Sequence, residues 1–309
     1  MRHVKRFIDI FENSPELTPD QIGWLDKCTG GKWSLNPDTG LVDVEGDFDC
    51  RAQQIKGFNG VKFGHVSGNF NCGTNDITSL EGAPQSVGVD FLCYGNWLTS
   101  LEGSPQEVGR RFLCYSNKLV SLKGAPQKVP SDFDCSTNRL TSLEGAPLVE
   151  DGSFRCYGNR LTSLEGAPQI VTGDFFCNAN SLTTLEGGPL EVGRDFRCSY
   201  NKITSLKGAP NSVGRYFNCA NNQLTSLEGA PPIDDDYIRS NGNPISQESI
   251  DRIIALMDHS KIKLEQAVAY FWEIIPDDDK AYLAKHNPDL SPDEIKGYEA
   301  LARLKKRVL

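Results

Sequence analysis

The chain lacks any long apolar run. It has 309 residues, of which 38% are hydrophobic, yet no segment approaches the roughly 18 apolar residues that a membrane span needs. The opening stretch MRHVKRFIDIFENS starts basic but contains no apolar run of about seven residues, as a cleavable secretory signal requires. We therefore expect a cytoplasmic protein with no membrane partner.

Positive charge is also scarce. The formal net charge is -9 and the isoelectric point is about 5.1, with the acidic residues spread along the chain. Binding to a phosphate backbone needs clustered Lys and Arg, so we expect no nucleic acid partner. The composition leaves the oligomeric state open and favours a monomer.

Motifs of common catalytic sites are missing. The chain contains no Walker loop, no H-E-x-x-H and no G-x-S-x-G, and its four histidines, His3, His65, His259 and His286, are scattered. An acidic first helical turn accounts for Asp277–Lys280, and a solvated turn accounts for Asp234–Asp236, where local calcium binding is the alternative. We predict a protein that is not an enzyme and needs neither cofactor nor metal.

The cysteines, by contrast, are periodic. There are ten, the first steps are 22 residues and every later step is 21: Cys28, Cys50, Cys72, Cys93, Cys114, Cys135, Cys156, Cys177, Cys198 and Cys219. Close C-x-x-C pairs typical of zinc sites are absent, and disulfide frameworks have mixed spacings. One thiol per period indicates that each fills the same buried slot of a repeating unit.

An octapeptide repeats with the cysteines. LTSLEGAP at Leu140–Pro147 recurs at Leu161–Pro168 and Leu224–Pro231, with five near copies elsewhere. Aligned on Cys, the whole unit reads V-G-x-x-F-x-C-x-x-N-x-L-T-S-L-E-G-A-P-x-x. Alternation in F-x-C predicts a short strand with Phe and Cys inward, and the Asn can satisfy backbone groups where that strand ends. The Glu row after L-T-S-L is expected to be a solvated face.

This unit resembles the leucine-rich repeat, whose core is L-x-x-L-x-L-x-x-N-x-L in repeats of about 20–29 residues. Here F-x-C replaces L-x-L, and the repeat length is similar to that of the shortest bacterial class. The return segment is too short for an α-helix, so we expect an extended or polyproline-like return. The resemblance implies a parallel β-solenoid in which identical neighbours stack because one unit cannot bury its own apolar face.

The expected architecture has three parts. A solenoid of about ten turns covers residues 46–245, a cap of helices and a hairpin covers residues 1–45, and an α-helical capping domain covers residues 246–309. This layout resembles leucine-rich-repeat proteins encoded by tailed phages, which would place the protein in the cytoplasm of a host cell.

Specific signals predict the elements of the amino-terminal cap. A first helix is expected at Val4–Glu12. A second should begin after Thr18 as N-cap, with Pro19 at the first helical position and Gln21 completing a capping box. A hairpin is expected around Asn36–Gly40.

Outward-facing strand positions differ from turn to turn, and several hold large side chains. Tyr, Trp and Arg are enriched at binding hot spots, so we predict a protein-binding surface on the concave face. Its residues are Leu92, Tyr94, Trp97, Leu113, Tyr115, Arg155, Tyr157, Phe176 and Arg197. A basic row would border it at Lys118, Arg139, Arg160 and Lys202, and an acidic row at Asp90, Asp132, Asp174 and Asp195.

These features predict a non-enzymatic module that binds an unidentified protein, and the phage resemblance suggests an inhibitor or sequestering factor for a host protein. Two alternatives stay open. The repeats could be a scaffold or spacer that presents the carboxy-terminal helical domain, or that domain could carry an unrecognised enzymatic or nucleotide-binding activity.

Overall fold

The computed structural model describes residues 16–231 and 238–246. The chain divides into two compact units, Met1–Ser153 and Phe154–Leu309, and each is described by itself. The predicted helix at Val4–Glu12, the acidic turn at Asp234–Asp236 and the carboxy-terminal helical domain lie outside the described residues. Among the described residues, no helix is long and apolar enough to cross a membrane.

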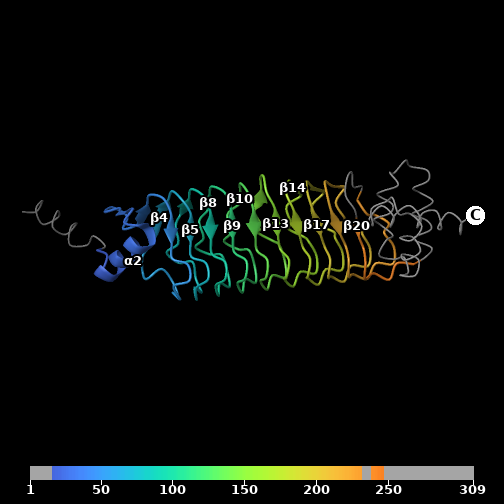
Figure 1. Ribbon diagram of the computed structural model, residues 1–309, viewed down its shortest axis with the longest axis horizontal. Coiled ribbons are helices and arrows are strands. Elements are labelled where there is room, and N and C mark those ends of the chain that lie inside the picture. The colour runs from blue at the N-terminus through green and yellow to red at the C-terminus, as the bar shows by residue number, and fades with distance from the viewer. Residues whose placement is uncertain (1–15, 232–237, 247–309) are drawn as a thin grey trace, which may run out of the picture. The chain divides into compact units, whose positions relative to one another are not determined.

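The first unit begins with the predicted helix and hairpin. Helix α2 runs over Pro19–Thr29 and starts at a complete capping box, in which Thr18 and Gln21 each accept a hydrogen bond from the other's backbone. The antiparallel pair β1 (Trp33–Leu35) and β2 (Val42–Val44) forms the hairpin. Figure 1 shows α2 at the amino-terminal end of the strands.

Each turn of the first unit then contributes two short strands rather than the single one predicted. One set starts at the Phe slot, and we name these the Phe strands: β3 (Phe48–Asp49), β5 (Phe70–Asn71), β7 (Phe91–Leu92), β9 (Phe112–Leu113) and β11 (Phe133–Asp134). The other set ends at the Val slot, and we name these the Val strands: β2, β4 (Phe63–Val66), β6 (Ser86–Val87), β8 (Glu107–Val108), β10 (Lys128–Val129) and β12 (Leu148–Val149). Neighbouring Phe strands pair in parallel, and the Val strands form two parallel groups, β2 to β8 and β10 with β12.

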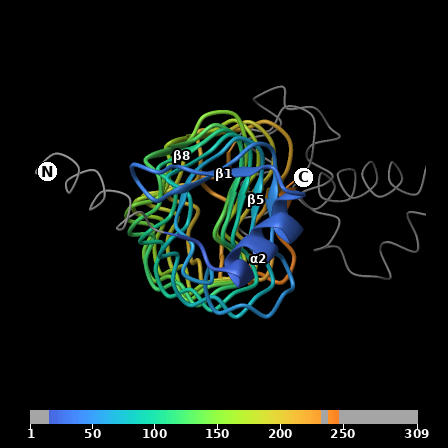
Figure 2. The same cartoon turned by 90° about the vertical axis from the view of Figure 1, so that its left-hand side faces the viewer.

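The second unit repeats the plan. Its Phe strands are β13 (Phe154–Arg155), β15 (Phe175–Phe176), β17 (Phe196–Arg197), β19 (Phe217–Asn218) and β20 (Ile238–Arg239), and its Val strands are β14 (Ile170–Val171), β16 (Glu191–Val192) and β18 (Ser212–Val213). Equivalent residues pair, as in Phe175 with Phe196. The predicted parallel β-solenoid is therefore present in each unit. Figure 2, a view along the stack, shows β5 and β8 on different sides of the coil.

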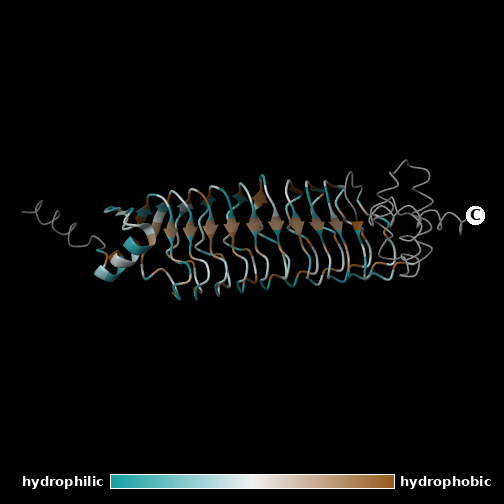
Figure 3. Cartoon of the chain, in the orientation of Figure 1, coloured by the Kyte–Doolittle hydropathy of each residue, from teal (hydrophilic) through white to brown (hydrophobic). Residues whose placement is uncertain are grey.

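The core of each turn consists of the repeated residues. Phe and Cys of the Phe strand and both leucines of the octapeptide are almost fully buried in every complete turn, as the alternation predicts. Within the second unit the Phe rings stack at centroid separations of 5.4–5.5 Å from Phe175 to Phe217. Figure 3 shows the Phe strands as a hydrophobic row. Identical slots one above the other therefore demand identical residues.

Most positions of the octapeptide have a structural task. In Leu140–Pro147, both leucines and the proline are buried. The hydroxyl of Ser142 accepts a hydrogen bond from the backbone N–H of Glu144 at 3.0 Å. Gly145 has a φ of 83°, in the left-handed region that disfavours side chains. The octapeptide is thus the part of the scaffold that turns the chain.

The glycine of the V-G pair allows successive turns to approach closely. A Cβ on Gly109 would collide with the carbonyl of Gly88 in the preceding turn, and one on Gly88 would collide with the carbonyl of Ser67. The backbone N–H of Gly109 instead donates to the carbonyl of Val87 at 2.9 Å. This corner allows the turns of Val87 and Val108 to approach closely just before their Phe strands, whereas Pro130 and Glu150 occupy the same slot in later turns.

A ladder of Asn side chains joins consecutive turns. The Asn117 amide donates to the carbonyls of Cys114, in its own turn, and Cys93, in the preceding turn, at 3.1 and 3.0 Å. Its side-chain oxygen accepts a hydrogen bond from the backbone N–H of Leu98 at 3.0 Å. The predicted satisfaction of backbone groups is confirmed, and it extends to the neighbouring turn. The same bridging pattern is made by Asn96, Asn138, Asn201 and Asn222.

All ten cysteines are buried and free. Nine occupy the predicted slot, whereas Cys28 lies in helix α2, where it continues the row of thiols into the cap. Burial raises the pKa of the Cys219 thiol to about 12, and it raises the pKa of Cys114 and Cys177 well above the usual value. The groups therefore stay neutral and act as small hydrophobic side chains.

One backbone feature has no counterpart in the sequence pattern. The residue directly before each ladder Asn adopts a left-handed conformation, whatever its type: φ is 56° at Thr74, 63° at Gly95 and 55° at Ser116. For a residue with a Cβ this conformation costs about 1–2 kcal/mol. The non-glycine residues here therefore carry local strain that the rest of the turn offsets.

The pair Thr74 and Gly95 tests this strain within one unit. Thr74→Gly should raise the free energy of unfolding by about 0.5 kcal/mol, since relief of strain exceeds the entropy gained by the unfolded chain. Gly95→Thr should lower it by about 1–2 kcal/mol. Equilibrium denaturation with urea measures both. Shifts of the same sign in the two variants would contradict the account.

Candidate protein-binding surface

In the first unit, the predicted outward side chains form a connected surface. The rings of Tyr94 and Tyr115 stack with centroids 4.8 Å apart and planes 4° from parallel. Leu92 and Leu113 pair in register on β7 and β9 and are half-buried, like both tyrosines. The two aromatic and two aliphatic groups therefore make a continuous, partly exposed apolar strip across neighbouring turns.

The small size of Gly73 explains how the Tyr94–Tyr115 stack begins. A Cβ on Gly73 would lie 2.6 Å from the ring of Tyr94, so that ring leans over Gly73 in the preceding turn. Gly73 is itself buried, and its backbone N–H donates to the side chain of Asn71 at 3.1 Å. The small residue at this slot thus provides the platform on which the tyrosines pack.

Trp97 and Lys118 extend the strip at the strand exit. The Trp97 side chain is 50% exposed, and the ammonium group of Lys118 lies 3.4 Å from the centroid of its ring. Such a cation–π contact orients both groups at the surface. Arg139, the next residue of the basic row in this unit, is exposed.

In the second unit, the predicted outward side chains are more basic than in the first. The guanidinium carbons of Arg197 and Arg155 lie 4.5 and 5.8 Å from the ring centroid of Phe176, which sits between them. Tyr157 is half-buried, and the basic-row residues Arg160 and Lys202 are exposed. The predicted site residues are therefore at the surface in both units, grouped around tyrosines in one and around arginines in the other.

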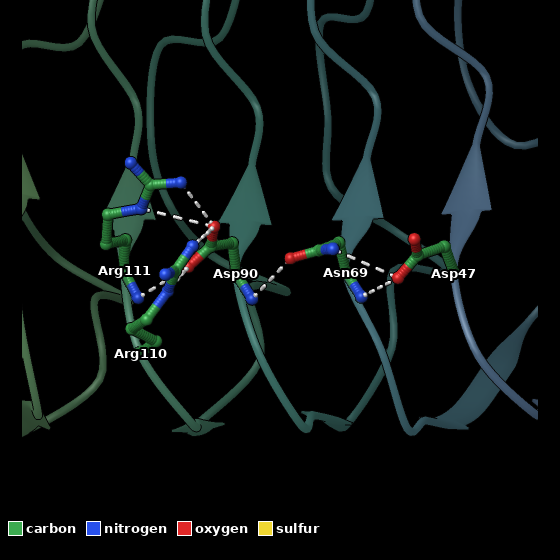
Figure 4. Close-up of polar contacts among 5 residues, drawn as sticks. All are labelled: Asp47, Asn69, Asp90, Arg110 and Arg111. Atoms are coloured by element: carbon green, nitrogen blue, oxygen red, sulfur yellow. Dashed lines mark hydrogen bonds and ion pairs between the residues drawn. The ribbon is translucent and has the colours of Figure 1, made fainter.

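The acidic row differs from its prediction, because Asp90 is only 2% exposed. Its carboxylate accepts hydrogen bonds from the guanidinium groups of Arg110, at 2.9 and 2.7 Å, and Arg111, at 3.1 and 2.6 Å. Figure 4 shows this cluster as part of a chain of contacts in which Asp47 accepts from Asn69, and Asn69 accepts from the backbone of Asp90. The row joins turns and does not form an open acidic border there.

The second unit repeats this arrangement at Asp195, also 2% exposed. Arg197 and Arg215 both donate to its carboxylate at 2.8 Å. Burial alone would raise the pKa of Asp195, but the hydrogen bonds from Arg215 and Arg197 outweigh it and hold the pKa below its usual value. Both buried carboxylates are thus ionised and neutralised locally.

The Glu row behaves as the predicted solvated face. Its lysines form exposed ion pairs with the preceding turn, Lys123 with Glu102 at 2.7 Å and Lys207 with Glu186 at 2.8 Å. No group of three or more potential metal ligands occurs among the residues that the structure describes.

Two features of the surface were missed from sequence. Arg110 and Arg111 occupy slots that the consensus leaves open, and only the stacking of turns shows that both reach Asp90. Tyr200 is 64% exposed and has a φ of 55°, an unusual combination for an aromatic residue. An aromatic residue at a slot otherwise held by Gly, Ser, Thr, Ala or Asn was the available signal.

Asp90 gives a pH-dependent prediction. Burial opposes its charge, but hydrogen bonds from Arg110 and Arg111 dominate and hold the pKa of Asp90 well below its usual range. Its contribution to stability is therefore complete above about pH 4 and is lost as the pH falls through the folded-state pKa. Asp90→Asn should lower the free energy of unfolding by about 2 kcal/mol at pH 7, and by less at pH 2.

Exposed Asp76 provides the matched control, since Asp76→Asn makes the same charge change. Urea denaturation at several pH values measures both variants. An Asp90→Asn effect no larger than that of Asp76→Asn at pH 7 would contradict the role assigned to the cluster.

Comparisons with known proteins give limited information. No protein-family model matches the chain, and no curated protein matches it. Among solved structures, it is similar to YopM from Yersinia enterocolitica WA-314, with 14% identity, a TM-score of 0.33, and coverage of 80% of this chain and 69% of that one. It is also similar to the LRR protein LIC12759 of Leptospira interrogans, with 15% identity, a TM-score of 0.22, and coverage of 68% and 93%. At these values the likeness says nothing about a partner, and the fold rests on the strand registers given above.

Proposed function

We propose that the protein is a binding module whose outward Phe-strand face holds a protein partner, with its apolar centre on the first unit. The observation that carries the proposal is the strip formed by the Tyr94–Tyr115 stack and the Trp97–Lys118 pair. The scaffold does not require these side chains, because the slot of Tyr94 and Tyr115 holds Gly73 and Ser136 in flanking turns of the same unit.

The chemistry of the strip suits a protein surface. Rigid aromatic side chains offer large contact areas at low cost in conformational entropy, and partly exposed Tyr and Trp are typical binding hot spots. Lys118 and Arg139 border the strip and would orient a partner with acidic groups at its rim. The expected contact thus has an apolar centre and a charged border.

The most specific form of the proposal is a phage-encoded inhibitor or sequestering factor that acts on a host protein in the cytoplasm. It rests on the layout of the sequence alone. The two alternatives, a spacer for residues 246–309 or an activity within them, concern residues that the structure does not describe beyond Ser246. Deleting residues 247–309 separates them from the proposal, since partner capture should survive if the strip carries it.

Substitution of the strip is the main test. Trp97→Ala or Tyr115→Ala should weaken capture of the partner by about 2 kcal/mol, or roughly 30-fold in Kd, if each is a hot spot. The full-length protein would be immobilised, its partners identified by mass spectrometry, and their affinities measured by biolayer interferometry. Thermal unfolding of each variant would be recorded alongside.

Glu144→Ala is the control, because Glu144 is exposed and belongs to the solvated Glu row, not to a Phe strand. It should leave affinity unchanged. If Glu144→Ala weakens capture while Trp97→Ala and Tyr115→Ala do not, the face assigned here is wrong.

A further inference from the structure

The described part of the second unit departs from the acidity of the chain as a whole. Residues 154–231 and 238–246 contain eight Lys and Arg but six Asp and Glu, whereas the full chain has a net charge of -9. Its exposed acidic residues lie mainly on the Glu row and the Val strands, at Glu165, Glu186, Glu191 and Glu228. The Phe-strand face is therefore left with an excess of positive charge.

Four of the cations are arranged on two turns. Arg155 and Arg160 lie on the turn of Cys156, and Arg197 and Lys202 occupy the equivalent positions on the turn of Cys198. The turn between them carries the uncharged Phe176 and Ser181 at the same slots. With strands about 4.8 Å apart, the two cationic turns are separated by roughly 10 Å.

The cationic side chains on these turns differ in how many of their N–H groups already have a partner within the protein. Arg197 is anchored by Asp195 at 2.8 Å and lies against Phe176, yet its Nε is buried without a hydrogen-bond partner. The side chains of Arg160 and Lys202 are exposed and form no ion pair among the described residues. One arginine is thus fixed in place, and two further cations are available to a ligand.

Tyr200 supplies an independent indication of contact. Its left-handed backbone, with a φ of 55°, costs about 1–2 kcal/mol for a residue with a Cβ. Its ring is 64% exposed and recovers little of this cost by burial. The strain is common to every turn, but the large ring is not required by it, because the same slot holds Gly158, Ala179 and Asn221 in the other turns of this unit. Tyr200 lies on the same turn as Arg197 and Lys202.

We propose that this face of the second unit binds an extended acidic peptide segment of a protein partner, with carboxylates on the turns of Arg160 and Lys202 and the chain covering Tyr200. The spacing fits such a ligand. A polyproline-like chain repeats its side-chain direction every three residues, or about 9 Å, close to the separation of the two cationic turns. Acidic residues at positions i and i+3 would meet one cationic turn each.

A peptide fits these observations better than a nucleic acid. Bases bind by stacking on open aromatic faces, whereas the ring of Phe176 lies beneath Arg197 at 4.5 Å. Each strand of a duplex also carries a phosphate about every 3.4 Å along the helix axis. Such a strand would place uncompensated charge over the neutral turn of Phe176 and Ser181.

The inference rests on the proposed protein-binding function and names the chemistry of the partner segment. It can fail separately, because its residues are in the second unit and the apolar strip is in the first. Trp97→Ala should leave acidic-peptide binding unchanged, whatever it does to capture of the natural partner.

The test uses the full chain and a fluorescein-labelled peptide of four Glu-Pro-Ser repeats, in which every third residue is acidic. Anisotropy titrations at low salt should show saturable binding, and the matched Gln-Pro-Ser peptide should show none. The double variant Arg160→Ala/Lys202→Ala should bind about tenfold more weakly, because two partly exposed ion pairs are lost.

A charge-matched control separates the site from general electrostatics. Lys123→Ala/Lys207→Ala also removes two cations, but from ion pairs on the Glu row. It should change affinity by less than about twofold, because these exposed charges are screened by salt. Equal loss in the two doubles, absence of binding, or tighter binding of a labelled dT20 oligonucleotide with the same sensitivity to Arg160→Ala/Lys202→Ala would each overturn the proposal.

Tyr200→Gly gives a readout that a purely structural role would not produce. It should raise the unfolding midpoint by relieving the left-handed strain, yet weaken binding of the Glu-Pro-Ser peptide by about threefold through lost contact. A variant that is more stable and binds as tightly as the wild type would remove Tyr200 from the site.

Discussion

The fold depends on the Asn side chain that closes each turn. Backbone hydrogen bonds join each Phe strand to the next turn, as from Phe91 to Arg111 at 2.9 Å, but the buried N–H of Leu98, beyond the strand, is bound by a side chain. Asn117 provides this side chain, which binds carbonyls of its own and the preceding turn and accepts the buried N–H of Leu98. A buried amide left without such a partner costs about 1–3 kcal/mol, so the same residue is needed at every level.

This constraint divides the residues of a turn into two classes. Phe, Cys, the octapeptide leucines and the corner glycines face equivalent residues above and below, so a change at one level disturbs its neighbours. Large side chains at outward strand positions, such as Tyr94 and Arg197, are partly exposed, and the residue type at these positions differs between turns. The stacked tyrosines of the first unit and the arginines around Phe176 in the second occupy these variable outward positions. Binding chemistry can therefore vary along the array at little cost to folding.

Sequence periodicity predicted the inward Phe and Cys, the helix after Thr18 and the hairpin, because each depends on local pattern or on a slot repeated in register. It missed the Val strands, because they pair between turns and have no local apolar alternation. It also missed the neutralisation of Asp90, because the partners Arg110 and Arg111 come from the next turn. The outward residues were identified correctly as surface groups. Their contacts, such as the Tyr94–Tyr115 stack, depend on how side chains of successive turns pack, which periodicity does not give.

Hydrogen exchange at a single amide tests the central claim most directly. The N–H of Leu98 is buried and has the Asn117 side chain as its acceptor. In wild-type protein this amide should exchange as slowly as its strand neighbours, and in Asn117→Ala it should exchange about ten- to a hundredfold faster, as expected for the loss of one buried hydrogen bond. Unchanged protection of Leu98 in a folded Asn117→Ala variant would show that the turns hold together without the Asn ladder.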